Sequence, residues 1–407
     1  MIVGPCWVIT GGAEPHVIED GAVRVVGAHI SQVGLAGSLA RAHPDETLWP
    51  ARGRVLLPGL VNTHAHLARH LARGFEFRWP VDWDRYDRAL SPEDVYSSAM
   101  AALVEGVRHG VTTVCDFHRS GACLDLSLTE VVRAASRVGV RVATCYGAGD
   151  DDPPAERRAA FEENLGFASQ LAQQRQGRLR GLVGVRARTL LGIERLLAEA
   201  LEAAGDRLAV HVDLALDATP AEPWNGGRWP GSALPAIWAH AERAPRRLVS
   251  LVHERGDALT GIGSGHAGAL GRETELSWGS DAGLNAPPLP EPGPTWAHAG
   301  AAANHYRCRF VTGARWAAQH FGEGLGVIES GAPADLLLVD YRPATELSSR
   351  TLHAHMASGM LRAPVSGVMV AGEVVMDNGT LVTLDEGEVA ARARECARRV
   401  WERLREA

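Results

Sequence analysis

The chain has 407 residues, enough for one large domain with a smaller companion or for two ordinary domains. Hydrophobic residues make up 46% of it and charged residues 22%, a composition that excludes a disordered, collagen-like or coiled-coil protein. The net charge of −7 provides no basic field to attract nucleic acid or anionic lipid. All 41 basic residues are arginine, so no lysine can form a Schiff base or a carbamate bridge between two metal ions.

The cysteines and the N-terminal segment indicate the cellular compartment of the protein. The six cysteines lie far apart and form no CxxC pair, so we expect free thiols in a reducing environment. The N-terminal segment lacks the basic and apolar regions of a signal peptide. No run of about 18 apolar residues is present to cross a membrane. We therefore expect a cytoplasmic protein with no nucleic-acid and no membrane partner.

Both ends of the chain contain short strands joined by tight turns. Residues 22–33 alternate around a Gly-Ala-His turn, as in a hairpin, and residues 368–375 form a second hairpin around Ala-Gly. Residues 334–341 are an apolar run typical of a buried strand. We therefore predict one small β-sandwich domain built from residues 1–54 and 326–385.

Residues 55–325 alternate apolar strand segments with amphipathic helices, which is typical of a parallel sheet covered by helices. The expected strands include 55–61, 111–116, 141–146, 179–185, 208–212 and 248–253, and the expected helices include 92–108, 126–138, 155–174 and 191–204. The length fits a (β/α)₈ TIM-like barrel, for which about 250 residues is usual. A doubly wound sheet is the alternative, but no GxGxxG follows the first strand. Residues 386–407 are expected to form a helix that packs on the outside.

The strongest chemical signal is the segment PGLVNTHAH, residues 58–66. Side chains at positions i and i+2 of a strand share a face, so His64 and His66 point into the barrel at the carboxyl end of its first strand. Catalytic groups gather at that end in this fold. Two imidazoles that converge on one point are typical of a metal site.

Later expected strands end in polar residues at the same mouth of the barrel. His211 and His253 each end an apolar run, and Asp281 follows the segment LSWGS. By itself, a polar residue at the end of an apolar strand is ordinary and does not indicate a metal ligand. Together with the two histidines of the first strand, they supply imidazoles and a carboxylate to one divalent cation.

These motifs resemble the amidohydrolase superfamily, and the resemblance extends over nearly the whole chain. The segment PGLVNTHAH, the two strand-end histidines, GSDA at residues 279–282 and GAPADLLLVD at residues 331–340 carry it. Within the superfamily the chain is most similar to the cytosine-deaminase and chlorohydrolase branch, and there to SsnA-type aminohydrolases. That closer similarity lies in the segments DRALSPEDVYSSAM, GVTTVCDFH and ARARECARRVWERL.

The resemblance implies one divalent metal bound by His64, His66, His211 and Asp281, with Zn²⁺ favoured and Fe²⁺ as the alternative. Asp281 would take the proton of a metal-activated water, and His253 would contact that water or the substrate. The substrate would be a small cyclic or heteroaromatic compound whose C–N or C–halogen bond is hydrolysed. A homodimer is the state that the resemblance implies, and the absence of lysine agrees with a mononuclear site.

The segment after His211 departs from the family pattern, which has a proton-shuttling glutamate three residues later. Leu214 stands at that position and cannot carry a proton. Asp213 is adjacent, but on a continuing strand it would face the other way, so it can replace the glutamate only if the strand ends early. His266, in a loop-like segment, is the second candidate for the replacement. Loss of a general acid costs roughly 10²–10⁴-fold in rate.

The spacing and the pocket also depart from the pattern. Only 27 residues separate His253 from Asp281, whereas two strand–helix units need roughly 60, so we expect strand seven to be shortened or lost. Arg186 stands where the family usually has a histidine, and it would suit a substrate carboxylate, with a structural salt bridge as the alternative. His118 and Trp83 are further candidates for substrate binding.

Two main hypotheses about function follow. The first is a metal-dependent hydrolase of the aminohydrolase type that acts on a small cyclic substrate. The second is a catalytically degenerate homologue with a binding or assembly role, which Leu214 and the short strand-seven region favour. A scaffold without a metal is a third class, and the retained ligand set argues against it.

Overall fold

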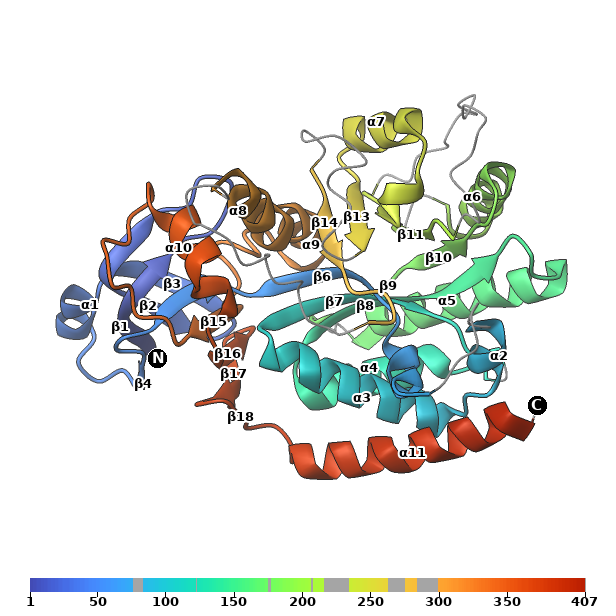
Figure 1. Ribbon diagram of the computed structural model, residues 1–407, viewed down its shortest axis with the longest axis horizontal. Helices are drawn as coiled ribbons and strands as arrows, with labels where there is room; N and C mark the ends of the chain where they lie inside the picture. The colour runs from blue at the N-terminus through green and yellow to red at the C-terminus, as the bar shows by residue number, and fades with distance from the viewer. Residues whose placement is uncertain are drawn as a thin grey trace. The chain divides into compact units, whose positions relative to one another are not determined.

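The computed structural model describes residues 1–75, 83–121, 123–174, 177–205, 208–215, 234–262, 275–283 and 299–406. The chain divides into two compact units (Figure 1). The first is formed by residues 1–62, 106–113 and 286–384, and the second by residues 63–105, 114–285 and 385–407. Among the described residues, no helix combines the length and the apolar character needed to cross a membrane.

The first unit contains a mixed nine-stranded sheet that both chain ends build. Its order is β18-β17-β16-β15-β5-β1-β2-β3, with β4 beside β1. The strands are β1 Ile2–Ile9, β2 Val17–Val26, β3 His29–Leu35, β4 Leu48–Pro50, β5 Val55–Pro58, β15 Leu336–Val339, β16 Val365–Val370, β17 Glu373–Asp377 and β18 Thr380–Leu381. The antiparallel pairing of β15 with β5 joins the two ends in one sheet, as predicted.

Buried aliphatic side chains from both ends form the core of this sheet, among them Val8, Leu56, Leu336 and Met369. Burial of such side chains is the main force that holds the two distant segments together. The helices of the unit are α1 Ala36–Ala42, α8 Ala299–Tyr306, the π-helix η5 Arg307–Thr312, α9 Gly313–Phe321, α10 Leu352–Ser358 and the 3₁₀ helix η6 Met360–Arg362.

The second unit contains an eight-stranded parallel barrel, as predicted. Its order is β6-β7-β8-β10-β11-β12-β13-β14, and β9 pairs with β8. The strands are β6 Leu60–Ala65, β7 Val111–His118, β8 Arg141–Gly149, β9 Leu179–Gly181, β10 Val183–Arg186, β11 Val210–Asp213, β12 Ile237–Ala239, β13 Ala258–Ile262 and β14 Ser277–Gly279. The helices are η1 Leu67–Ala72, α2 Trp83–Arg88, α3 Pro92–Arg108, α4 Ser127–Val138, α5 Pro154–Gln174, α6 Leu190–Ala204, η2 Ala241–Arg243, α7 Arg246–Glu254 and α11 Glu386–Glu406.

The first and last strands of the barrel meet through main-chain contacts and buried hydroxyls. Ala65 and Asp281 form a parallel bridge, which nearly closes the barrel. The Thr63 hydroxyl lies 2.9 Å from that of Thr260 and 2.8 Å from that of Ser277, so β6, β13 and β14 share one hydrogen-bonded cluster. Because the three hydroxyls satisfy one another away from water, they fix these strands at little cost of desolvation.

The prediction of a strand at residues 248–253 is wrong, because this segment belongs to helix α7. Leu248, Val249 and Val252 are buried at helical spacing, while Ser250 and His253 face solvent. The apolar run LVSLV is short enough to fit either period, so periodicity alone could not decide it. Strand six is instead β12, three residues long.

Strand seven is present as β13. Strands six, seven and eight begin at Ile237, Ala258 and Ser277, so each strand–helix unit in this part of the barrel takes about 20 residues rather than the usual 30. The sequence is therefore short in the connections between these strands. The sequence predicted a reduced strand seven because His253 was taken as the end of strand six. His253 lies on α7, after strand six, so the count started too late in the chain.

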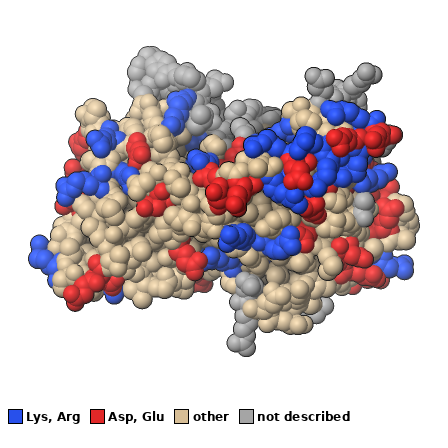
Figure 2. All heavy atoms as spheres, turned by 90° about the horizontal axis from the view of Figure 1, so that it is seen from below, with Lys and Arg blue, Asp and Glu red and all other residues tan. Residues whose placement is uncertain are grey.

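The C-terminal helix α11 packs on α2, α3 and η1 within the second unit. Arg392 and Arg399 pair with Glu93 of α3, and Arg403 pairs with Asp94. Figure 2, which views the molecule from below, shows basic and acidic side chains intermixed on this face. The arginine-rich sequence of α11 therefore creates no one-sign field.

Asp94 has two roles at the start of α3. Its Oδ2 accepts hydrogen bonds from the Ser91 backbone N–H at 2.9 Å and the Ser91 hydroxyl at 2.6 Å, and it pairs with Arg403 of α11. We expect Asp94→Ala to lower the free energy of unfolding by about 1–3 kcal/mol, because a helix cap and a buried acceptor are lost together. Glu93→Ala, which removes an exposed neighbour, is the control and should change stability by less than about 0.5 kcal/mol. Urea titration measures both values, and equal effects would contradict the assignment.

Candidate metal centre

His66 presents one ring nitrogen to the barrel mouth. Its Nδ1 lies 2.7 Å from the carbonyl oxygen of Phe117, which can only accept, so Nδ1 carries the proton. The other nitrogen, Nε2, lies 3.1 Å from Oδ1 of Asp281. A lone pair and a carboxylate oxygen this close require a proton or a cation between them. Fixing one nitrogen by a backbone carbonyl is also how metal-binding histidines are oriented.

Backbone hydrogen bonds to the end of β6 hold Asp281 in a strained conformation. Its φ of +53° is in the left-handed region, which is uncommon for a residue other than glycine. The backbone N–H of Asp281 donates to the carbonyl of His64 at 3.1 Å, and its own carbonyl accepts from the N–H of His66 at 3.0 Å. Burial alone would raise the pKa of Asp281, but the hydrogen bond and charge of His66 outweigh it and hold that pKa well below its usual range.

The donor set of this mouth fits one divalent cation. Oδ1 of Asp281 lies 3.1 Å from Nε2 of His66 and 3.8 Å from Nε2 of His64. Nε2 of His211 lies 2.9 Å from Nδ1, the other ring nitrogen of His64. Tetrahedral zinc with bonds of about 2.0–2.1 Å needs ligand atoms about 3.4 Å apart, within the range seen here. Burial and the neighbouring imidazoles lower the pKa values of His64 and His211 well below the ordinary value. Both rings are therefore neutral, which is the form that binds a metal.

His240, which was not among the candidates from the sequence, lies at the end of strand six. It follows β12 with a φ of +57°. Its Nδ1 lies 3.2 Å from Glu242, and its Nε2 lies 3.7 Å from Asp213 and 3.9 Å from Asp281. Burial would lower the pKa of His240, but Glu242 and the two aspartates outweigh it and raise that pKa. The sequence signal was the short run IWAH, a histidine directly after three apolar residues.

His253 does not occupy the place predicted for it. The structure puts it on the exposed side of α7 rather than at a strand end. The strand-six histidine at the barrel mouth is His240.

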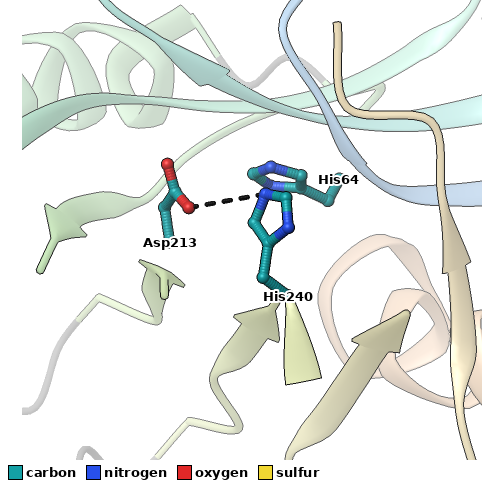
Figure 3. Close-up of side chains that lie close together, drawn as sticks. All are labelled: His64, Asp213 and His240. Atoms are coloured by element: carbon teal, nitrogen blue, oxygen red, sulfur yellow. Dashed lines mark ion pairs between the residues drawn. The ribbon is translucent and has the colours of Figure 1, made fainter. Parts of the chain in front are cut away.

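Asp213 reaches the same cluster (Figure 3). Strand β11 ends at Asp213, two residues after His211, so the two side chains share a face. Asp213 is 4% exposed, and its ligand oxygen forms a compact group with ring nitrogens of His64 and His240, all within 4.8 Å of one another. The adjacent Leu214 is fully buried. Asp213 therefore reaches the cluster by the ordinary alternation of β11, as the last residue of that strand.

The remaining predicted site residues have structural partners or lie outside the described chain. Nη1 of Arg186 pairs with Asp84 at 3.2 Å, which is the salt-bridge alternative. Trp83 lies under the guanidinium of Arg69, whose Cζ is 4.7 Å from the ring centroid. His118 is buried, with Nε2 at 2.8 Å from the hydroxyl of Ser120, and burial lowers its pKa to about 3. The last residue, His266, lies outside the described residues.

Asp116 fixes the backbone next to His66. Its two oxygens accept hydrogen bonds from the backbone N–H of Leu67 at 2.9 Å and from the hydroxyl of Thr144 at 2.8 Å. These contacts fix the residue that follows His66 to β7 and β8. Burial outweighs the two hydrogen bonds and raises the pKa of Asp116 to about 6.

Comparisons with known proteins agree with this geometry. A model described as the amidohydrolase family matches residues 55–221. The 5-methylthioadenosine/S-adenosylhomocysteine deaminase of Pelotomaculum thermopropionicum is 25% identical, and the match covers 99% of each chain. The deaminase of the same name from Natronomonas pharaonis is 28% identical over 86% of this chain and 87% of the relative. The chain is thus similar to the amidohydrolase family over residues 55–221, and to these deaminases over most of its length.

Solved structures of the same fold extend over the whole chain. An adenosine deaminase from Xanthomonas campestris with bound zinc has a TM-score of 0.70 and 22% identity and covers 98% of both chains. The atrazine chlorohydrolase TrzN from Arthrobacter aurescens, complexed with zinc, has a TM-score of 0.71 and 20% identity, covering 97% of this chain and 99% of the other. The amidohydrolase fold and the donor set confirm the predicted class, a metal-dependent hydrolase. The SsnA-type assignment stays a prediction.

The metal content of variants tests this centre. We expect about one zinc per chain in the wild type after reconstitution and desalting, because the donor set suits a single ion. His66→Ala and Asp281→Ala should lose most of the bound zinc, since each removes one of the converging donors. His253→Ala, the control on α7, should retain it. Inductively coupled plasma mass spectrometry measures the content, and stoichiometric zinc in the Asp281 variant would contradict the proposed ligand set.

Proposed function

We propose that this protein is a zinc-dependent deaminase of adenine nucleosides of the 5-methylthioadenosine and S-adenosylhomocysteine type. The observation that carries the proposal is the compact group of His64, His66 and Asp281 at the carboxyl ends of the barrel strands, with His240 and Asp213 beside it. The matches to deaminases of that name, which cover 92–99% of this chain, support the substrate class.

His64, His66, His211 and Asp281 would hold the zinc ion. When bound, zinc supplies a Lewis acid that makes water a nucleophile at neutral pH. Asp281 is one-third exposed, and its low pKa keeps it ionised. It accepts the proton of the attacking water and orients that water toward the ring carbon that carries the amino group.

His240 and Asp213 would complete the proton transfers. Water adds its oxygen to the ring carbon, the C–N bond breaks, and the amino group leaves as ammonia after gaining a proton. Nε2 of His240 lies between the carboxylates of Asp213 and Asp281, and Glu242 fixes the other ring nitrogen. His240 therefore hydrogen-bonds to the water or the substrate, and Asp213 moves the proton to the ring nitrogen and the leaving group. This is the role for which the family pattern uses a glutamate at the position of Leu214.

The degenerate homologue is the second candidate, because Leu214 removes the usual shuttle. It would keep the barrel and the metal but lack turnover. The buried carboxylate of Asp213 at the same mouth favours the enzyme. A cytoplasmic homodimer stays the expectation for location and assembly, and light scattering on the purified protein measures the latter.

Turnover of defined nucleosides tests the activity. The zinc-loaded protein is given 5-methylthioadenosine, S-adenosylhomocysteine and, as a comparison, a chlorinated triazine, and ammonia and chloride release are measured. We expect ammonia from at least one nucleoside. His240→Asn should lower kcat/KM by roughly 100-fold or more, because it removes a contact to the reacting groups, whereas His253→Asn should leave it unchanged. Turnover that is absent throughout, or that His253→Asn alone abolishes, would contradict the proposal.

Asp213→Asn tests the replacement of the shuttle. The amide keeps the size of the side chain but cannot move a proton, so we expect kcat to fall by roughly 10²–10⁴-fold while zinc content stays at the wild-type level. Leu214→Met, which keeps the buried volume, is the matched control and should be nearly neutral. Stopped assays of ammonia release give kcat and KM separately. A kcat for Asp213→Asn within about threefold of the wild type would show that another group carries the proton.

A further inference from the structure

A surface pocket of about 610 Å³ lies where three segments of the first unit meet. The segments are the turn between β4 and β5, the residues that follow β15, and the turn between β17 and β18. The volume lies within the range of about 300–1,000 Å³ that is usual for small-molecule sites. The residues that line this pocket include none of those proposed for zinc binding or deamination.

Hydrogen bonds centred on Arg54 join the three segments. Its Nε donates to Oδ1 of Asp340 at 2.9 Å, and its Nη2 donates to Oδ1 of Asn378 at 2.8 Å. The indole N–H of Trp49 donates to Oδ1 of Asp377 at 2.9 Å, which links β4 to β17 a second time. Because these side chains bond the three segments to one another, the walls of the pocket are in place before a ligand binds.

The wall of the pocket contains more positive than negative charge. Arg52 and Arg342 line it together with Arg54, and both are exposed and have no hydrogen bond or ion pair within the described chain. Asp340 is the one acid among the described residues of the wall, and it is already paired with Arg54. The pocket therefore presents two guanidinium charges that no described residue of its wall balances.

Arg342 is better placed than Arg52 to be the main contact of a ligand. Its guanidinium packs on Gly53, where an added Cβ would lie 3.1 Å from Nε and 3.6 Å from Nη2 of Arg342. The φ of +76° at residue 53 also favours glycine, so the space that Arg342 uses stays open. Arg52 borders an adjoining pocket that Glu19 and Asp20 also line, although in the described chain it pairs with neither. Arg52 therefore supplies a second, more distant charge.

We propose that this pocket binds a small phosphate monoester, with Arg342 as the main contact and Arg52 as the second. A phosphate monoester carries a charge of about −1.5 to −2 at neutral pH, which matches the two unbalanced guanidinium groups. The planar guanidinium can donate two parallel hydrogen bonds to two phosphate oxygens. Among the described residues of the wall, Pro50 is the one with an apolar side chain, so a large apolar part of a ligand would find little surface to pack on.

Isothermal titration calorimetry with glycerol 3-phosphate tests the site, with succinate as the dicarboxylate comparison and glycerol as the uncharged one. We expect the zinc-loaded full chain to bind one glycerol 3-phosphate. Arg342→Gln should weaken that binding by roughly 10-fold or more, because charge-assisted hydrogen bonds are lost, and Arg52→Gln should weaken it less. Arg350→Gln, which changes an exposed arginine of the same unit outside the pocket, is the matched control and should bind like the wild type.

Two further measurements separate this site from the metal centre and from folding. Wild type stripped of zinc by a chelator, and His66→Ala, should bind glycerol 3-phosphate as the zinc-loaded wild type does, whether or not the protein deaminates nucleosides. Arg52 and Arg342 have no described partner to lose, so the Tm of each glutamine variant should stay within about 2 °C of the wild type.

Four results would overturn the proposal. A wild type that does not bind glycerol 3-phosphate has no such site, and tighter binding of succinate would replace the phosphate by a carboxylate. Undiminished binding by Arg342→Gln would locate the phosphate elsewhere. An equal loss in Arg350→Gln would show general attraction by positive charge rather than a pocket.

Discussion

The contact between Asp281 and the end of β6 is the interaction on which the rest of the second unit depends. The main chain of Asp281 exchanges hydrogen bonds with His64 and His66, which nearly closes the barrel, while its carboxylate faces Nε2 of His66. The contacts that nearly close the barrel therefore also bring the donor atoms of the site together. A change that separates β14 from β6 removes the geometry of the site together with the closure of the fold.

The short strands of the second half of the barrel explain why the site is made of unusual backbone conformations. Strands β12 and β14 have three residues each, so the functional side chains follow the strands instead of lying on them. His240 and Asp281 both have positive φ, which costs roughly 1–3 kcal/mol at a residue other than glycine. Hydrogen bonds to Glu242 and to β6 hold them there. Such strain commonly accompanies side chains that are aimed at a ligand.

The first half of the barrel could be predicted from the sequence because its helices and strands have distinct periods. The candidate ligands His64, His66, His211 and Asp281 could be selected as well, because polar residues that end several apolar runs meet at one edge of a parallel barrel. Strand six could not be found in this way. Its three residues carry too little periodicity, and the buried face of α7 imitates a strand. The proximity of Asp213 to His240 depends on where β11 ends, which only the three-dimensional structure reveals.

A crystal structure of the zinc-loaded protein, with the anomalous signal of zinc used to locate the ion, is the decisive measurement for the metal centre. We predict one zinc ion whose ligands are His64, His66, His211 and Asp281, with bonds of about 2.0–2.2 Å, and with His240 near the ion but not bound to it. Zinc bound by cysteine, zinc bound away from the carboxyl end of β6, or the absence of an ion at this mouth in a fully loaded crystal would contradict the assignment.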